Sequence, residues 1–156
     1  MIKLINILRE ITEGKQVGTL YHYTFTWYLY KIIKTNTLES EDDWISFTRS
    51  KDKNQFEISQ DSNCVIVVDG DKLSNKYKIK PFQDLGFVSI GGVEDEMEER
   101  VLGPINDLNK YIIKIIIYIT HSYDNDQSDN KWVSKNILQT EELLKEKNIP
   151  YEIIKL

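Results

Sequence analysis

The stretch CVIVV, residues 64–68, decides how this sequence folds. Its five apolar residues follow one another without a polar break, and four of them are β-branched. A run of this kind is typical of a strand that is buried on both faces. Such a strand lies inside a sheet, with strands on both sides and another layer of structure packed against it. The rest of the sequence therefore has to supply those strands and that layer.

Strand patterns occur before and after this run. Besides residues 64–68, the predicted strands are residues 19–24, 44–48, 77–82, 111–120 and, more weakly, 151–154. Residues 111–120 give the strongest strand pattern in the chain. Pro81 has no N–H to donate to a ladder, so it predicts a strand end or the edge of the sheet. Asp69-Gly70-Asp71 predicts a turn after the central run.

Helical patterns alternate with these strands. Residues 2–13 carry apolar side chains near helical spacing. Thr26 is the predicted N-cap of a second helix, which ends at Asn36 in a left-handed conformation. A third helix is predicted from Ile137 to about Asn148. The order of helix, strand, helix and then several strands favours an α+β fold, with residues 1–156 in one domain.

Composition excludes several classes of protein. The chain has 156 residues with 20 Lys+Arg against 25 Asp+Glu, and its net charge of -5 argues against binding to extended duplex nucleic acid. One cysteine, Cys64, cannot form an internal disulfide, which indicates a reducing compartment. One Cys and two well-separated His argue against a metal site. No signal peptide and no membrane span is recognisable, so we expect a cytoplasmic protein with no membrane partner.

Two strands carry polar residues that a strand does not need. In the first, His22 and Thr24 share one face while Tyr21 and Tyr23 share the other, because side chains alternate. A neutral His beside a hydroxyl can hold a ligand hydroxyl or amide, but a half-buried His bonded to a backbone carbonyl explains the pattern as well. In the second, Ser46 and Thr48 share a face and are followed by Arg49.

The planar guanidinium of Arg49 suits a phosphate or a carboxylate, although pairing with the acidic residues 41–43 explains it as well. The third polar segment is residues 96–102, EMEERVL. As a helix it is a solvated acidic turn. As a strand it places Glu98 and Arg100 on one face and Glu99 on the other. Carboxylates that face a cleft in this way are typical of catalytic sites.

Other chemistry-bearing signatures are missing from the sequence. There is no phosphate-binding P-loop, no GxGxxG and no nucleophile elbow. Cys64 lies within the apolar run and is expected in the core rather than in a nucleophilic site. The aromatic residues Trp27, Tyr28 and Tyr30 are expected to pack the second helix rather than to stack nucleobases.

The order of the pieces resembles the ADP-ribosyltransferase superfamily. In that superfamily a first strand carries His followed by a small or hydroxyl residue, as in LYHYT at residues 20–24. A helix then leads to a short stretch like IIKTNTL at 32–38, and a second strand carries Ser, Thr or Tyr, as in ISFTR at 45–49. A late strand carries Glu, often as ExE, before apolar residues and Pro, as in EMEERVLGP at 96–104. The His-x-Thr opening is also similar to that of DarT-type toxins and small relatives from phages and bacterial defence loci.

The resemblance implies a fold, a substrate and residue roles. The fold is a single-domain ADP-ribosyltransferase-like one, with a split mixed or antiparallel sheet as its core and flanking helices. The substrate is NAD+, with no metal. Glu98 or Glu99 is the implied catalytic carboxylate, in a register that the sequence leaves open, and His22 assists it. The implied NAD+-binding residues are His22, Tyr23, Thr24, Ser46, Thr48 and Arg49.

The acceptor of the ADP-ribosyl group cannot be assigned from the residues. The charge balance suits a protein side chain or a nucleotide better than long duplex nucleic acid. A phage origin, and hence the cytoplasm of a host, fits the Lys-, Asn- and Ile-rich composition. The rival interpretation is a catalytically inactive protein of the same fold, which acts as a binding or inhibitory partner in phage–host conflict.

Overall fold

The chain is represented by a computed structural model that describes residues 17–40, 43–49, 51, 63–82, 98–119 and 127–155. Residues 2–13, for which a helix is predicted, lie outside the described residues, as do Glu96 and Met97. The elements are β1 (Thr19–Thr24), α2 (Thr26–Thr35), β2 (Thr37–Leu38), β3 (Trp44–Thr48), β4 (Cys64–Asp69), α4 (Gly70–Ser74), β5 (Ile79–Phe82), β6 (Glu98–Leu102), β7 (Ile105–Asn106), the 3-10 turn η2 (Leu108–Lys110), β8 (Ile112–Ile119), α5 (Gln127–Glu146) and β9 (Tyr151–Lys155).

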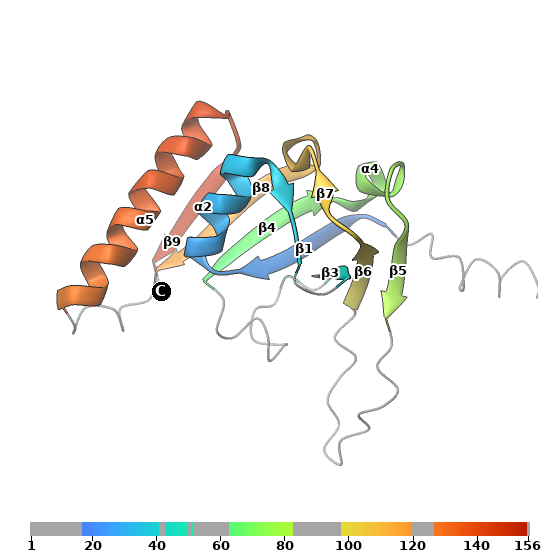
Figure 1. Cartoon of the computed structure of the whole chain (residues 1–156), viewed down its shortest axis with the longest axis horizontal. Helices are drawn as coiled ribbons and strands as arrows, with labels where there is room; N and C mark the ends of the chain where they lie inside the picture. Colours follow the sequence, from blue (N-terminus) through green and yellow to red (C-terminus); the bar gives the residue numbers. More distant parts are fainter. Residues whose placement is uncertain are drawn as a thin grey trace, which may run out of the picture.

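A seven-stranded sheet in the order β5-β6-β3-β1-β4-β8-β9 forms the centre of the fold. Its neighbouring strands are antiparallel except β8 and β9, which are parallel. A separate pair, β2 and β7, is also antiparallel. Helices α2 and α5 lie beside each other on one side of the sheet (Figure 1). The α+β class expected from the sequence is therefore confirmed, with a mostly antiparallel sheet.

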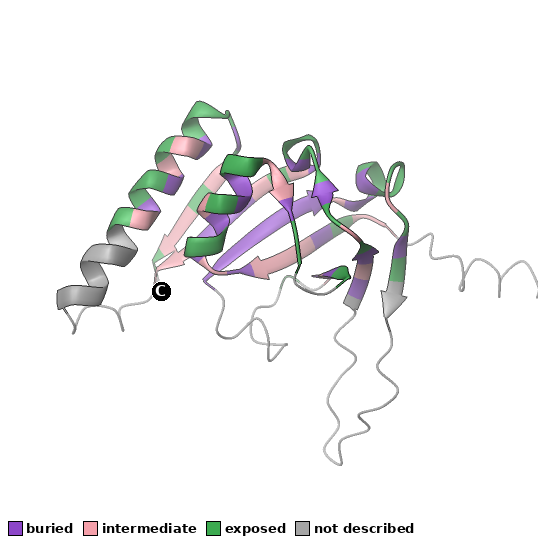
Figure 2. Cartoon of the chain, in the orientation of Figure 1, coloured by how far each residue is buried: buried purple, intermediate pink, exposed green. Residues whose placement is uncertain are grey.

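The apolar run at residues 64–68 is part of the interior strand β4. Its residues from Cys64 to Val68 are all buried, as Figure 2 shows by the purple colour of this strand. Four strands lie on one side of β4 in the sheet and two on the other. Strand β5 is the edge next to β6, so the interpretation of Pro81 as a residue of a sheet edge is also confirmed.

The two faces of the sheet carry different side chains. On the helix-covered face, Leu20 and Ile66 join the main core together with residues of α2 and α5. On the opposite face, Val65, Val67 and Ile116 form a smaller cluster. The partly buried side chains that pack against this smaller cluster are Tyr21, Tyr23, Tyr118 and Ile154. The alternation expected along β1 is therefore present, with its tyrosines facing away from the helices.

Helix α2 begins in a different way from the one the sequence predicts. The N-cap position is Phe25, which makes no side-chain cap, and Thr26 is the first helical residue. The side chain of Asn63, directly before β4, takes the capping role instead. Its Oδ1 accepts a hydrogen bond from the Thr26 N–H at 2.9 Å, and its Nδ2 donates to the Thr26 hydroxyl at 3.0 Å. The cap was missed because it comes from a residue 37 positions away in sequence.

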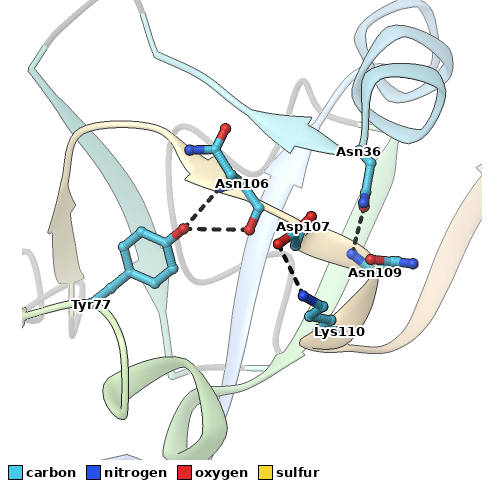
Figure 3. A network of polar contacts seen from close by, with 6 residues as sticks. All are labelled: Asn36, Tyr77, Asn106, Asp107, Asn109 and Lys110. Atoms are coloured by element: carbon cyan, nitrogen blue, oxygen red, sulfur yellow. Dashed lines mark hydrogen bonds and ion pairs between the residues drawn. The ribbon is translucent and has the colours of Figure 1, made fainter.

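The end of α2 matches its prediction and anchors a polar network (Figure 3). Asn36 is left-handed, with φ 56°. Its carbonyl accepts from the Leu108 N–H at 3.0 Å, and its side-chain oxygen accepts from the Asn109 N–H at 2.8 Å. Tyr77 fixes the neighbouring strand, since its hydroxyl accepts from the Asn106 N–H at 2.9 Å and lies 3.3 Å from the Asn106 carbonyl. The Asn36 bonds tie η2 to the end of α2, and the Tyr77 bonds tie β7 to the segment after α4.

The predicted turn at residues 69–71 is the start of the short helix α4. Asp69 caps it by accepting a hydrogen bond from the Lys72 N–H at 2.9 Å. Gly70 donates its N–H to the Gly18 carbonyl at 2.8 Å, and a Cβ at position 70 would lie 2.6 Å from that oxygen. The close approach of two backbones, rather than a turn conformation, therefore requires glycine here.

Replacing Asn63 by Ala should destabilise the fold. The change leaves the buried Thr26 N–H and hydroxyl without the bonds that Asn63 supplies. We expect a loss of about 1–3 kcal/mol in the free energy of unfolding, measured by urea denaturation. Asn106→Ala is the control, because Asn106 is exposed and bonds to Tyr77 through its backbone, and it should change stability by less than about 0.5 kcal/mol. Equal losses in the two variants would contradict the role of Asn63.

Candidate active site

His22 lies in the middle of β1 on the helix-covered face. Its Nδ1 is 2.9 Å from the carbonyl oxygen of Ser46 on β3. A carbonyl can only accept a hydrogen bond, so Nδ1 carries the proton and Nε2 presents a lone pair. Burial lowers the pKa of the imidazole, and the bond to the Ser46 carbonyl opposes this more weakly. His22 is therefore a neutral ring with its acceptor nitrogen fixed, the form that can hold a ligand hydroxyl.

A hollow of about 340 Å³ adjoins this ring. From β1 it is lined by His22 and Thr24, and from α2 by one helical face that includes Tyr28 and Lys31. The segment after α2, including Glu39, lines the rest. Its volume is at the lower end of the range of small-molecule sites. It combines hydroxyl, imidazole, aromatic and ammonium groups, a set that suits a sugar or nucleotide more than an apolar ligand.

Glu99 is the buried carboxylate of β6. It pairs with Phe47 across the β3–β6 ladder, and only 3% of its surface is exposed. Arg49, the residue after β3, forms an ion pair with its Oε1. Burial raises the pKa of this carboxyl group, while the charge and the hydrogen bond of Arg49 act to lower it. The segment that contains Glu99 is extended over residues 98–102, so the strand alternative, and not the helical one, holds for this part of the chain.

His22, Phe47 and Glu99 lie on the same face of three adjacent strands. The His22 and Phe47 ring centroids are 5.6 Å apart, and Phe47 is the direct partner of Glu99 in the next ladder. Two strand spacings separate the backbones of His22 and Glu99, or about 10 Å. The buried Phe47 ring stands between them. The sheet thus brings together on one face two residues that are far apart in sequence.

The other predicted site residues are distributed over both faces. Tyr21 pairs with Thr48, which places Thr48 and Ser46 on the tyrosine face, opposite His22. Ser46 still contributes to the His22 side, through its carbonyl. Tyr23 also faces away from His22, and its hydroxyl donates to the Lys51 carbonyl at 3.3 Å. Side chains of Tyr23, Ser46 and Thr48 therefore do not share the His22 hollow.

Glu98 and Glu99, the two candidates for the catalytic carboxylate, differ in their partners in the β3–β6 ladder. Glu98 pairs with Thr48, and Glu99 pairs with Phe47 and binds Arg49. Since Phe47 contacts His22, Glu99 is the glutamate in line with the His22 face.

Arg49 also lines a second hollow of about 830 Å³, beside α4. Its wall also carries the carboxylates of Asp69 and Asp71 and the ammonium group of Lys72. This hollow is wider than the one at His22, but neither His22 nor Glu99 lines it. We place the candidate site at His22, because the smaller hollow adjoins its imidazole and His22 lies on the sheet face that also carries Glu99.

The contribution of α2 to the hollow was not predicted from the sequence. Trp27 and Tyr28 were expected to pack the helix, yet 42% and 51% of their surfaces are exposed. Tyr28, Lys31 and Thr35 line the hollow at positions i, i+3 and i+7, which fall on one helical face. The available signal was this spacing in a segment that directly follows the strand with His22. The same spacing is typical of residues that pack in the core, and the sequence does not show which face of α2 the sheet covers.

Within the described part of the chain, no group of His, Cys, Asp or Glu could hold a metal ion. Over the same residues, no helix has the length and apolar character needed to cross a membrane. No protein-family model matches the sequence, and no curated protein matches it.

His22 should remain neutral, with its proton on Nδ1, at pH 7. The lowered pKa means that the unfolded chain binds this proton more readily than the folded one, so the His22 contribution to stability falls as the pH drops below the unfolded pKa. Ring-nitrogen NMR shifts report the tautomer, and urea unfolding at several pH values reports the stability. In His22→Asn the loss between pH 7 and pH 5.5 should be smaller. A charged imidazole at pH 7 would contradict the assignment.

Replacing Arg49 by Gln should destabilise the fold in a pH-dependent way. Without the cation, the pKa of Glu99 rises further, and the folded state then binds a proton that the unfolded state releases. Stability therefore falls as the pH rises, and we expect a deficit of about 1–3 kcal/mol at pH 8 that shrinks toward pH 5. Lys114→Gln, which breaks the exposed pair with Glu152, is the control and should cost less than about 1 kcal/mol. A deficit of equal size at both pH values would mean that Arg49 acts by packing alone.

Proposed function

We propose that this chain is an NAD+-dependent ADP-ribosyltransferase with an ADP-ribosyltransferase-like fold. The observation that carries the proposal is the row of His22, Phe47 and Glu99 on one face of β1, β3 and β6. The resemblance to that superfamily rests on a His strand, a hydroxyl-bearing strand and a late Glu strand. In the sheet these are β1, β3 and β6, which are adjacent in this order.

The chemistry follows from the bond to be broken. NAD+ supplies a glycosidic bond between ribose and nicotinamide; its electron pair leaves with nicotinamide, positive charge builds on the ribose, and an acceptor nucleophile then bonds to that carbon and gives up a proton. Glu99 stabilises the charge through its carboxylate. Arg49 is a positioning residue, since it favours the ionised form of Glu99 against the effect of burial.

His22 holds the sugar rather than moving a proton. Its neutral ring offers Nε2 as an acceptor for a ribose hydroxyl, and the Ser46 carbonyl fixes the orientation of the ring. Thr24 lies on the same face of β1 and lines the same hollow. The acceptor of the ADP-ribosyl group is a protein side chain or a nucleotide, because the net charge of -5 opposes extended duplex nucleic acid.

The second candidate function is a catalytically inactive binding or inhibitory protein of the same fold. The Arg49 ion pair and the 3% exposure of Glu99 favour it, because a carboxylate so engaged is poorly placed to meet a ribose. On this alternative the chain binds NAD+ or a partner at the His22 hollow without cleaving the glycosidic bond. The same assay separates the two functions.

Release of nicotinamide from NAD+ should depend on Glu99 and not on Glu98. With NAD+ and a cell lysate as the source of acceptor, we expect Glu99→Gln to lower release by about 100-fold or more, because the lost interaction is strongest in the transition state. NAD+ affinity should change little in this variant. The measurement is chromatographic quantitation of nicotinamide together with labelled ADP-ribose on the acceptor.

Glu98→Gln is the matched control and should retain most of the activity. The opposite pattern would assign the role to Glu98. If the wild-type protein binds NAD+ but releases no nicotinamide, and both variants are equally inactive, the transferase proposal is wrong and the binding function remains. Thermal denaturation of each variant shows whether the fold persists.

A further inference from the structure

The two outer strands of the seven-stranded sheet, β5 and β9, are built differently (Figure 1). Strand β5 contains Pro81, which has no N–H to donate, and the exposed Lys80. Proline and lysine in an edge strand oppose its pairing with another edge. Strand β9 reads YEIIK over residues 151–155, with no proline and with two consecutive isoleucines. Within the residues that the structure describes, no strand lies on the outer side of β9, so this edge is open to pairing.

Both apolar layers of the fold reach the β9 edge. Tyr151 and Ile153 pack against the main core on the helix-covered face of the sheet. Ile154 packs against the smaller cluster on the opposite face. All three side chains keep part of their surface exposed. A strand added beside β9 covers this remaining apolar surface on both faces at once, which favours its binding.

The pairing of β9 with β8 fixes which backbone groups point to the open edge. The Pro150 carbonyl, directly before β9, accepts a hydrogen bond from the Ile115 N–H of β8 at 2.9 Å. In a strand, the N–H and C=O of one residue point to the same side, and this side alternates from residue to residue. Every second residue after Pro150 therefore bonds to β8. The residues whose N–H and C=O face the open edge are Tyr151, Ile153 and Lys155.

We propose that β9 is a dimerisation strand, which pairs antiparallel with β9 of a second copy of this chain about a twofold axis. Outward-facing groups have to meet outward-facing groups, and the axis requires that the pairing be the same seen from either copy. The register that uses all the outward groups is centred on Ile153. In it Ile153 lies opposite Ile153 of the second copy, and Tyr151 lies opposite Lys155. Each of these pairs can exchange N–H···O=C bonds in both directions.

The side chains on the helix-covered face are complementary in this register. The Tyr151 hydroxyl donates to Glu141 Oε1 at 2.7 Å, and Lys145 binds the same oxygen at 2.8 Å. Lys155 is exposed. In the dimer, Lys155 of the second copy lies across from Tyr151, which brings its ammonium group toward the carboxylate of Glu141. The twofold axis repeats this attraction at the other end of the strand pair.

The arrangement closes as a dimer and leaves the candidate site open. On the face opposite the helices, Glu152 is paired with Lys114 at 2.9 Å, so it brings no unpaired charge to the interface. Pairing of β9 with β9 occupies the open edge of both copies, and the outer strands of the combined sheet are then the two protected β5 strands. The residues that line the His22 hollow lie on β1, on α2 and directly after α2, away from β9 in the sheet order.

Sedimentation velocity of the full chain between about 1 and 500 μM tests the proposal, because a pair of short strands is expected to dissociate in this range. The wild type should pass from monomer to dimer as its concentration rises. Lys155→Glu should weaken dimerisation at least about tenfold, since it brings two acidic groups together at both ends of the strand pair. Lys155→Pro removes an outward N–H but no bond to β8, and it should abolish the dimer in this range. Lys155→Gln keeps the N–H and should weaken the dimer less than Lys155→Glu.

Lys80→Glu is the matched control. It makes the same change of charge on an exposed lysine of the protected edge β5, and it should leave dimerisation unchanged within about twofold. Circular dichroism and thermal denaturation show whether each variant is folded. A Lys80→Glu effect as large as that of Lys155→Glu would indicate general charge repulsion and would overturn the proposal. A wild type that stays monomeric up to about 500 μM, or a dimer that persists in folded Lys155→Pro, would overturn it as well.

Hydrogen exchange locates the interface by a separate measurement. The Ile153 amide, which faces the open edge, should exchange more slowly as the protein concentration rises. The Glu152 amide faces β8, and its exchange should change little. An Ile153 amide whose exchange does not depend on concentration in a sample that dimerises would place the interface elsewhere and overturn the proposal. None of these readouts involves NAD+, so failure of the dimer leaves the transferase proposal standing, and absence of nicotinamide release leaves the dimer standing.

Discussion

The alternation of side chains across the sheet is the constraint on which the rest of the structure depends. Strand β4 is buried along its length, so its register with β1 fixes which residues of β1 face the helices. His22 lies opposite Ile66 and faces the core side, while Tyr21 and Tyr23 face the other. The same alternation passes through β3 to β6 and selects Glu99 for the His22 side. A slip of one residue in any of these ladders would exchange the two sets.

The candidate site is built from groups that are costly to bury. The imidazole of His22 stays neutral because burial lowers its pKa, and the Ser46 carbonyl accepts its Nδ1 proton. The carboxylate of Glu99 is buried in the sheet together with the cation of Arg49. A buried charge without a partner costs several kcal/mol, so the Arg49–Glu99 pair is needed for the fold as well as for any chemistry. The buried aromatic ring of Phe47 lies between the two groups.

Much of the fold could be predicted from the sequence because the signals are local. The strands at residues 19–24, 44–48 and 64–69 follow from composition and alternation, and Asn36 follows from its tolerance of a left-handed backbone. The cap supplied by Asn63 could not be predicted, since it joins residues distant in sequence. For the site, strand alternation separated Glu99 from Glu98, but only the register of β3 with β6 shows which of them shares the His22 face. The exposure of Tyr28 depends on which face of α2 the sheet covers, which a single sequence does not encode locally.

The parallel pairing of β9 with β8 also has a consequence for how the chain folds during its synthesis. Strand β8, IIKIIIYI, has one antiparallel partner in β4 and gains its second only after α5 has been made and β9 has followed it. During synthesis on the ribosome, the most apolar strand of the protein therefore presents an unsatisfied ladder of N–H and C=O groups until the following helix and strand emerge. An unpaired strand edge is a template for pairing with other chains. In the folded protein β9 pairs with this edge of β8, so the strand that follows α5 removes that free ladder from solvent.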